Sequence, residues 1–158
     1  MRVFPIRLST LRPERTPMTS LASPQTTVTV SHTFEAGHRL HSIPGKCTSL
    51  HGHSWRMEVT IGSDTRTVLL PLFGTIKKAI RGWVDLHLDH GLILADDDPL
   101  LETLAAAGKV HVMPTLPTVE AVAWMLLDTL TELLGDGDAQ VLSVRLSETS
   151  TNSAEAIA

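Results

Sequence analysis

Two segments of this chain alternate between apolar and polar residues, and the second carries two histidines in its apolar row. Thr26–Phe34 places apolar residues at every second position, and His51–Ile61 does the same. Because successive side chains of a strand point to opposite faces, a period of two predicts two half-buried strands. The same alternation puts His51 and His53 on one face, in line with the apolar row.

The rest of the chain predicts further strands and helices around these two. Gly37 is expected to end the first strand, and Pro44-Gly45 marks a loop before His51. The other expected elements are a strand at Thr67–Leu72, helices at Gly74–Leu88, Pro99–Ala107 and Thr118 to about Leu134, and strands at Lys109–Met113 and Gln140–Glu148. Apolar residues recur at helical spacing in the two long helices, and Thr118 is a good N-cap. This order predicts an α+β domain with antiparallel hairpins and helices on one face.

Composition indicates one soluble globular domain, expected to occupy residues 26–158. The chain has 158 residues, of which 42% are hydrophobic and 19% charged. The sequence contains no run of eighteen apolar residues, so it does not predict a membrane span. The single cysteine cannot form an internal disulfide, which fits a reducing cytoplasm. A net charge of −4 gives no reason to expect nucleic-acid binding.

The first 25 residues differ from the rest of the chain. Four arginines stand against one glutamate in residues 1–17, and Ser, Thr and Pro are frequent without any sustained apolar period. We expect a disordered extension, or a start codon placed too early with Met18 as the true start. A transit peptide is the alternative, because such peptides are rich in Arg and Ser.

Four of the eight histidines lie between Gly37 and His53. Two imidazoles two positions apart on a strand can chelate one metal ion, and His38 can add a third nitrogen if the two strands pair. Three histidines leave a tetrahedral zinc ion one open position, as in catalytic zinc sites. The alternative is that His38 and His41 are ordinary loop residues, and His41 receives no role. His32 and His111 are expected to be structural.

Three other features carry chemistry. Cys47 lies in the loop beside Lys46; a lone cysteine is by default a small buried hydrophobe, but this setting favours a base or nucleophile. Asp89-His90 follows a helix end, and a carboxylate that sets the basicity of an imidazole suits a proton relay, although such a pair can also be merely solvated. Glu148 ends an alternating row, so its carboxylate should face inward and needs a partner such as an arginine or a ligand amidine.

Taken in order, these residues resemble the 6-pyruvoyl-tetrahydropterin synthase / 6-carboxy-tetrahydropterin synthase family over about residues 26–155. The matching segments are Phe34-Glu-Ala-Gly-His38-Arg-Leu, Cys47-x-x-x-His51-Gly-His53, Leu88-Asp89-His90, Pro117-Thr118-x-Glu120 and Glu148-Thr149. The resemblance implies a tunnelling fold, in which an antiparallel sheet is backed by helices. It also implies a homo-oligomer, a trimer or hexamer, with active sites between subunits.

The resemblance further implies a role for each matching residue. The implied zinc ligands are His38, His51 and His53. The implied proton acceptor is Cys47, and Asp89 and His90 are its implied relay. Glu148 is the implied pterin anchor and is counted in the relay, and the implied pocket residues are Thr118 and Glu120.

The spacing within the loop favours one branch of this family. Three residues separate Cys47 from His51, which resembles the 6-carboxy branch of the queuosine pathway; the pyruvoyl branch typically has a longer gap, and a folate-linked branch has a glutamate in this loop. The implied reaction is a zinc-dependent lyase reaction that converts 7,8-dihydroneopterin triphosphate to 6-carboxytetrahydropterin, acetaldehyde and triphosphate. The chain departs from the family pattern at Pro71-Leu72, where members carry Asp-Phe, and at Leu94, where members carry Asn.

Two other classes of protein share part of this pattern. The spacing from His51 to Glu58 fits much of the first metal motif of a cupin, but Glu58 lies on the strand face opposite His51 and His53, and no second motif follows. A non-catalytic pterin- or metal-binding relative is the other alternative, favoured by Pro71-Leu72 and Leu94.

Overall fold

The two alternating strands form a long hairpin at the centre of a six-stranded sheet. In this computed structural model, which describes residues 26–63, 72–134 and 139–158, β1 (Thr26–His38) pairs antiparallel with β2 (His51–Ser63). The expectation that Gly37 ends the first strand is wrong, because β1 continues to His38. Gly37 lies directly across from Gly52 in the register, and with no side chain at either position the two backbones stay paired to the end.

Four shorter strands complete the sheet in the order β4-β3-β1-β2-β5-β6. They are β3 (Gly91–Ala95), β4 (Val110–Met113), β5 (Gln140–Ser147) and β6 (Ser153–Ile157). On one side, β5 and β6 continue the antiparallel pairing; on the other, β3 runs parallel to β1, and β4 runs parallel to β3. The sheet is therefore mixed rather than wholly antiparallel, because helical segments connect β2 to β3 and β3 to β4.

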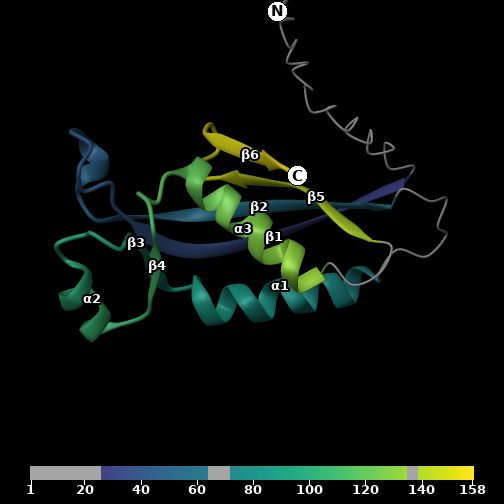
Figure 1. Cartoon of the computed structure of the whole chain (residues 1–158), viewed down its shortest axis with the longest axis horizontal. Helices are drawn as coiled ribbons and strands as arrows, with labels where there is room; N and C mark the ends of the chain where they lie inside the picture. The colour runs from purple at the N-terminus through teal and green to yellow at the C-terminus, as the bar shows by residue number, and fades with distance from the viewer. Residues whose placement is uncertain (1–25, 64–71, 135–138) are drawn as a thin grey trace, which may run out of the picture.

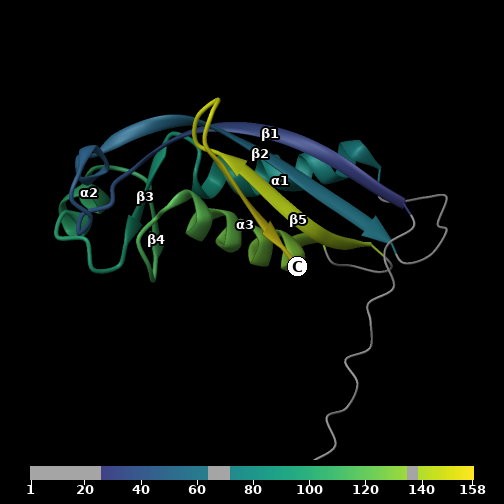
Figure 2. The same ribbon diagram turned by 90° about the horizontal axis from the view of Figure 1, so that it is seen from above.

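Helices pack on one face of this curved sheet. Figure 1 shows α1 (Phe73–His87) and α3 (Val119–Leu134) running along the strands, with α2 (Leu101–Ala107) at one end. In Figure 2, β1 and β2 arch together with α3 on the concave side. Thr118 caps α3 as predicted, because its Oγ1 accepts a hydrogen bond from the Ala121 N–H at 3.3 Å.

One hydrophobic core joins the sheet to the two long helices. Helix α1 contributes Ile76, Ile80 and Val84 at four-residue spacing, α3 contributes Val122, Leu126 and Leu130, and the hairpin contributes residues such as Phe34, Trp55 and Met57. Each of these side chains is at most 2% exposed. The helical and strand periods seen in the sequence therefore meet in a single apolar layer.

Most of the predicted elements are confirmed, and the α+β class is confirmed with them. Strands β3 and β6 were not predicted, since the helix around Gly74–Leu88 was expected to lead into a turn and the last strand was expected to be Gln140–Glu148. The expected strand Thr67–Leu72 lies outside the described residues except for Leu72, which is the N-cap of α1. The expected extension at 1–25 also lies outside them. None of the helices in the described ranges is long and apolar enough to cross a membrane.

Candidate metal centre

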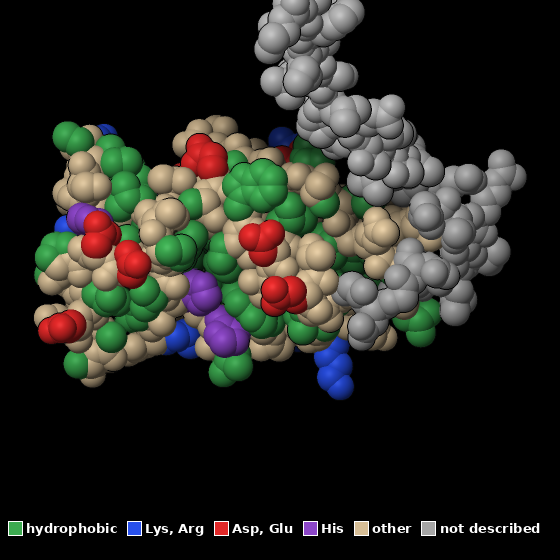
Figure 3. Space-filling view, in the orientation of Figure 1, with side chains coloured by type: hydrophobic (Ala, Val, Ile, Leu, Met, Phe, Trp, Pro, Cys, Tyr) green, Lys and Arg blue, Asp and Glu red, His purple; other side chains and the backbone are tan. Residues whose placement is uncertain are grey.

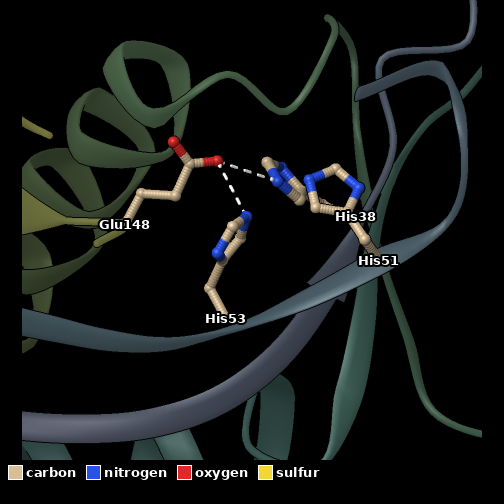
Figure 4. Close-up of side chains that lie close together, drawn as sticks. All are labelled: His38, His51, His53 and Glu148. Atoms are coloured by element: carbon tan, nitrogen blue, oxygen red, sulfur yellow. Dashed lines mark ion pairs between the residues drawn. The ribbon is translucent and has the colours of Figure 1, made fainter. Parts of the chain in front are cut away.

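Three histidines and one glutamate converge at one end of the sheet. His38, His51, His53 and Glu148 each offer one ligand atom, and these atoms all lie within 4.8 Å of one another (Figure 4). The pairing register brings them together: His38 is the cross-strand partner of His51, and His53 lies two positions further along the same face of β2. Glu148 directly follows β5, which pairs with β2 on its other side.

The geometry of the cluster suits a metal ion. The ring centroids of the three histidines are 4.6 to 5.2 Å apart. Glu148 Oε1 lies 3.0 Å from His38 Nε2 and 3.1 Å from His53 Nε2. Both nitrogens are buried and have no hydrogen bond of proper geometry within the described ranges. Buried imidazole nitrogens without a partner, aimed at one point beside a carboxylate, are the donor set that Zn²⁺ and similar ions bind.

In two of these rings, the other nitrogen makes a hydrogen bond to a backbone carbonyl oxygen. His38 Nδ1–H donates to the carbonyl oxygen of Pro117, and His51 Nδ1–H donates to that of Ser49, each at 2.8 Å. A ring that donates from Nδ1 presents the lone pair of Nε2 when it is neutral, and such carbonyl contacts orient metal-binding histidines. Sequence reasoning missed the role of Pro117; its place next to Thr118 in the matched motif was the only signal.

Burial also favours the ligand form of His38. Its side chain is 1% exposed, and this burial lowers the pKa of His38 below its ordinary value, with the Pro117 carbonyl and Glu148 opposing the effect and the other two histidines adding to it. A neutral imidazole is the form that binds metals. The lowered pKa of His38 therefore favours the form of this ring that can bind a metal ion.

The loop that carries Cys47 borders this cluster. It begins after His38 and ends at His51, and Cys47 lies exposed in its short 3₁₀ helix, η1 (Lys46–Thr48). The loop folds back on itself, because the Leu40 N–H donates to the Cys47 carbonyl oxygen at 2.8 Å. The thiol thus belongs to a segment whose two ends are candidate metal ligands.

Asp89 and His90 lie in the turn before β3 and contact β1 at Glu35. Asp89 Oδ2 accepts a hydrogen bond from His90 Nδ1 at 2.8 Å, and Asp89 Oδ1 accepts one from the Glu35 N–H at 2.9 Å. The Glu35 N–H is the main reason that the pKa of Asp89 lies below its ordinary value; burial opposes it, and the bond to His90 adds to it. His90 has φ 54°, a left-handed conformation that few residues other than glycine adopt, although histidine, asparagine and aspartate do so more often than the rest.

A pocket of about 330 Å³ lies beside His90, near the end of the β1–β2 hairpin. Its lining residues are Glu35, Ala36, Gly37, Gly52, His53, Ser54, His90 and Gly91. Gly37, Gly52 and Ser54 alternate with the three histidines along β1 and β2, so this pocket lies mainly on the face of the hairpin opposite to the histidine rings. The left-handed turn and the parallel pairing of β3 with β1 place His90 beside this pocket and Asp89 against the backbone of Glu35.

The remaining candidates lie apart from the cluster or at its edge. Thr118 caps α3, and Glu120 is exposed in the first turn of that helix, without a hydrogen bond or ion pair to the cluster in the described part of the chain. His41 lies near Asp97 and Asp98 instead. The two histidines expected to be structural, His32 and His111, are half-buried and lie outside the cluster. Leu94 and Glu58 also lie outside it: Leu94 is fully buried in β3, and Glu58 pairs with Arg56.

Comparison with known proteins assigns the chain to a family. The family model described as 6-pyruvoyl tetrahydropterin synthase matches residues 27–157. The chain belongs to this family. A 6-carboxy-5,6,7,8-tetrahydropterin synthase of Aquifex aeolicus is 33% identical over 149 residues, covering 77% of this chain and 91% of that protein. A synthase of the same name from Rickettsia typhi is 34% identical over 122 residues, covering 73% of this chain and 88% of that protein.

Solved structures show the same fold. A protein of Wolinella succinogenes superposes with a TM-score of 0.72 at 23% identity, covering 84% of this chain and 97% of that one. A 6-pyruvoyl tetrahydropterin synthase of Caenorhabditis elegans superposes with a TM-score of 0.61 at 22% identity, covering 84% and 95%. The tunnelling fold expected from the sequence is confirmed: a curled mixed sheet with helices packed on it.

Proposed function

We propose that this protein is a zinc-dependent 6-carboxy-5,6,7,8-tetrahydropterin synthase, a carbon–carbon lyase of 7-deazaguanine and queuosine biosynthesis. The observation that carries the proposal is the convergence of three histidines and Glu148 in a member of this family. The relatives that are 33% and 34% identical bear the name of this activity. The three-residue spacing from Cys47 to His51 supports the carboxy branch over the pyruvoyl branch.

The metal in this proposal is Zn²⁺, held by His38, His51 and His53. Three histidines leave a tetrahedral zinc ion one open position for substrate. When bound, the ion supplies a Lewis acid for the side-chain hydroxyls of the substrate. The two backbone carbonyls behind His38 and His51 keep their rings oriented toward the ion.

The protein groups around the metal move protons and hold the pterin. Cys47, as thiolate, removes a proton from the side chain of 7,8-dihydroneopterin triphosphate, and His90 returns protons with its ring oriented by Asp89. Glu148 binds the amidine edge of the pterin with a charge-assisted pair and belongs to the relay, while Thr118 and Glu120 line the pocket. Loss of triphosphate and cleavage of a carbon–carbon bond, with one water molecule consumed, then leave 6-carboxytetrahydropterin and acetaldehyde.

Two further parts of the proposal concern the setting of the enzyme. We infer that the chain works as a homo-oligomer, a trimer or hexamer, with sites at subunit interfaces, because β4 and β6 each have a partner strand on one side only among the described residues. A cytoplasmic location fits the single free cysteine.

An assay of the purified, zinc-loaded protein tests the activity. We expect acetaldehyde and the carboxylated pterin from 7,8-dihydroneopterin triphosphate, and we expect Cys47→Ala to abolish turnover while the zinc content stays that of the parent protein. A 6-pyruvoyl product with release of triphosphate would place the chain in the other branch. Bound zinc without turnover of any dihydropterin would support the non-catalytic alternative, and full activity of Cys47→Ala would exclude the role given to the thiol.

A further inference from the structure

One peptide unit in the turn between α1 and β3, the unit that joins Asp89 to His90, is held from both sides. Its N–H, which belongs to His90, donates to the Glu35 carbonyl oxygen at 2.7 Å. Its carbonyl oxygen, which belongs to Asp89, accepts a hydrogen bond from Lys109 Nζ at 2.7 Å. The N–H and C=O groups of a trans peptide point in opposite directions. Strand β1 therefore holds one side of the unit, and Lys109 holds the other.

The orientation of this unit sets the direction of the His90 ring. His90 has a left-handed φ of 54°, and its side chain is 79% exposed. Such a backbone conformation is unfavourable for a residue with a Cβ and persists where surrounding contacts fix it. The ring donates from Nδ1 to Asp89 Oδ2 at 2.8 Å. A rotation of the peptide unit would therefore displace the ring and the carboxylate from each other.

Lys109 also closes the end of α1. The Asp89 N–H donates to the Val84 carbonyl oxygen at 2.9 Å, one residue earlier than the helical pattern requires. Lys109 Nζ binds the Asp85 carbonyl oxygen instead, at 2.6 Å. A cation at the last carbonyls of a helix is favourable because of the helix dipole. Helix α1 ends at His87, however, so the bond to Asp89 lies beyond the helix and does more than end it.

The stem of Lys109 is fixed where it crosses the turn. The residue directly precedes β4, and its carbonyl oxygen accepts the Leu92 N–H at 3.0 Å. A Cβ at Gly91 would lie 2.9 Å from Lys109 Cδ and 3.1 Å from the Leu88 carbonyl oxygen, so the stem packs directly on the glycine backbone. Figure 3 shows histidine and basic side chains gathered over the end of α1 that lies nearest to β4 in Figure 1. Lys109 is therefore placed by β4 and reaches the turn with its ammonium group.

The charge of Lys109 acts on the same pair. The Glu35 N–H is the largest cause of the lowered pKa of Asp89, and the Lys109 ammonium adds to this effect. A charged Asp89 carboxylate accepts from His90 Nδ1, which leaves Nε2 of a neutral ring with its lone pair. An imidazole in this state can take up a proton at Nε2.

We propose that Lys109 is a positioning residue for the Asp89-His90 pair. By holding the Asp89 carbonyl from the side of β4, its ammonium group keeps the peptide unit in place and the ring of His90 on the Asp89 carboxylate. The role of the pair as a proton relay rests on the proposed function, whereas the contacts of Lys109 do not. Lys109 is 20 positions from Asp89 in the sequence, so this link exists only in the folded chain.

Nuclear magnetic resonance of isotope-labelled histidines, in the full-length and zinc-loaded protein, tests the positioning without an activity assay. In the parent protein we expect the neutral ring of His90 to carry its proton on Nδ1, because Asp89 Oδ2 accepts from that nitrogen. The variant K109M keeps the length of the side chain and removes the ammonium group. Its His90 ring should shift toward the Nε2–H tautomer, since the carboxylate is no longer fixed beside Nδ1. His90→Gln identifies the signal.

Steady-state kinetics on the same samples measure the effect on the proposed reaction. We expect K109M to lower kcat about tenfold or more and to leave KM within about twofold, because a positioned acid–base group acts in the chemical step. K109R keeps donors that can reach both carbonyls, so it should recover most of kcat and the Nδ1–H tautomer. The zinc content should be that of the parent protein in both variants.

Thr131→Val is the matched control for the loss of a bond to a helix carbonyl. Thr131 Oγ1 donates to the Leu127 carbonyl oxygen at 2.7 Å on α3, away from the turn, and we expect its loss to leave kcat and the His90 tautomer unchanged. If urea unfolding shows that K109M does not fold, K109Q, whose amide donates over a shorter reach, takes its place.

The outcomes separate this proposal from the proposed function. An unchanged His90 tautomer in K109M, or a kcat equal to that of an active parent protein, overturns the role of Lys109. An equal loss of kcat in Thr131→Val also overturns it, because the effect would then follow stability alone. A parent protein that turns over no dihydropterin contradicts the proposed function, and the tautomer of His90 still decides whether Lys109 positions the pair.

Discussion

At the scale of single residues, two histidines of the metal centre use their two ring nitrogens differently. His38 and His51 each use Nδ1 to donate to a backbone carbonyl, and this leaves Nε2 free. Glu148 has two candidate roles, as a metal ligand and as the anchor of the pterin. Its Oε1 lies next to Nε2 of both His38 and His53, which is where a fourth metal ligand would lie. The proposed function gives it to the pterin, since three histidines already suffice for zinc.

The substitution Glu148→Gln separates these two roles. We expect the zinc content to stay that of the parent protein and turnover to fall about 100-fold, because the amide cannot supply the charge that pairs with an amidine. Metal analysis and steady-state kinetics on the same sample measure both quantities. Glu155→Gln, on the exposed face of β6, is the control and should leave both unchanged. Loss of zinc in Glu148→Gln would instead make Glu148 a ligand.

At the scale of elements, the end of the β1–β2 hairpin is where three strands and the metal centre meet. Gly37 pairs with Gly52 across the hairpin, while β3 lies on the other side of β1. A Cβ at Gly37 would lie 2.7 Å from Leu92 Cδ2 and 3.1 Å from the His51 carbonyl oxygen. The close approach of β3, which positions His90, therefore depends on a glycine at this position.

We predict that Gly37→Ala lowers the free energy of unfolding by about 1–3 kcal/mol and weakens zinc binding, because the added carbon forces β1 away from Leu92 and from the backbone of His51. Urea unfolding and zinc titration measure the two effects. Gly52→Ala is a matched control across the same strand pair, since the atom nearest to its Cβ would be the Ala36 carbonyl oxygen at 3.7 Å. Equal destabilisation in the two variants would contradict the steric argument.

The loop that carries Cys47 is anchored by a buried carboxylate. Asp98, whose side chain is fully buried, accepts the Leu100 N–H at 2.8 Å and lies 3.4 Å from Arg39 Nε and 3.8 Å from His41 Nδ1. Arg39 and His41 flank Leu40, whose N–H binds the Cys47 carbonyl oxygen. His41, which received no role from the sequence, is therefore part of the contact between this loop and the start of α2.

We predict that Asp98→Asn destabilises the fold by about 3 kcal/mol, because it leaves the guanidinium of Arg39 without a charged partner in a mostly buried position. The free energy of unfolding in urea measures this. Asp97→Asn is the control: its side chain is 75% exposed and 3.5 Å from His41 Nε2, so we expect a change below about 1 kcal/mol. A similar loss in both variants would mean that Asp98 is not the anchor.

At the scale of the whole molecule, a small aromatic cluster joins β4, on the parallel side of the sheet, to α1. Trp83 stacks on His87 with ring centroids 4.6 Å apart, and His111 of β4 meets Trp83 edge-on at 5.8 Å. Burial, and then the neighbouring His87, lower the pKa of His111 below its ordinary value. The contact between β4 and α1 is thus most favourable when His111 is neutral.

This contact predicts a pH dependence of stability. Because the folded state binds a proton at His111 less readily than the unfolded chain does, the stability that His111 contributes decreases as the pH falls through about 6.5. We expect His111→Gln to show a smaller loss of unfolding free energy between pH 7.5 and pH 5.5 than the parent protein. His87→Gln should show a partial reduction. An unchanged pH dependence in His111→Gln would contradict this assignment.

Much of the fold and the candidate site followed from local pattern. The period of two showed the central hairpin and aligned His51 with His53, and helical spacing showed α1 and α3. Strand β3 could not be predicted from the sequence because it is short and paired on both sides. Ile93 to Ala95 are all buried, so they show no alternation of apolar and polar residues. Strand β6 is also short, and a five-residue edge strand carries little periodic signal.

The sequence by itself determined which residue types stand where along each strand and loop: two histidines on one face, a thiol in the loop before them, and a carboxylate at the end of a buried row. Only the tertiary structure decided which of these meet. The register sets His38 against His51, the parallel placement of β3 brings Asp89 to the N–H of Glu35, and Pro117 binds His38 from 79 positions further along the chain. The physical reason is that periodicity is a local property, whereas register and strand order depend on which apolar surfaces pack together.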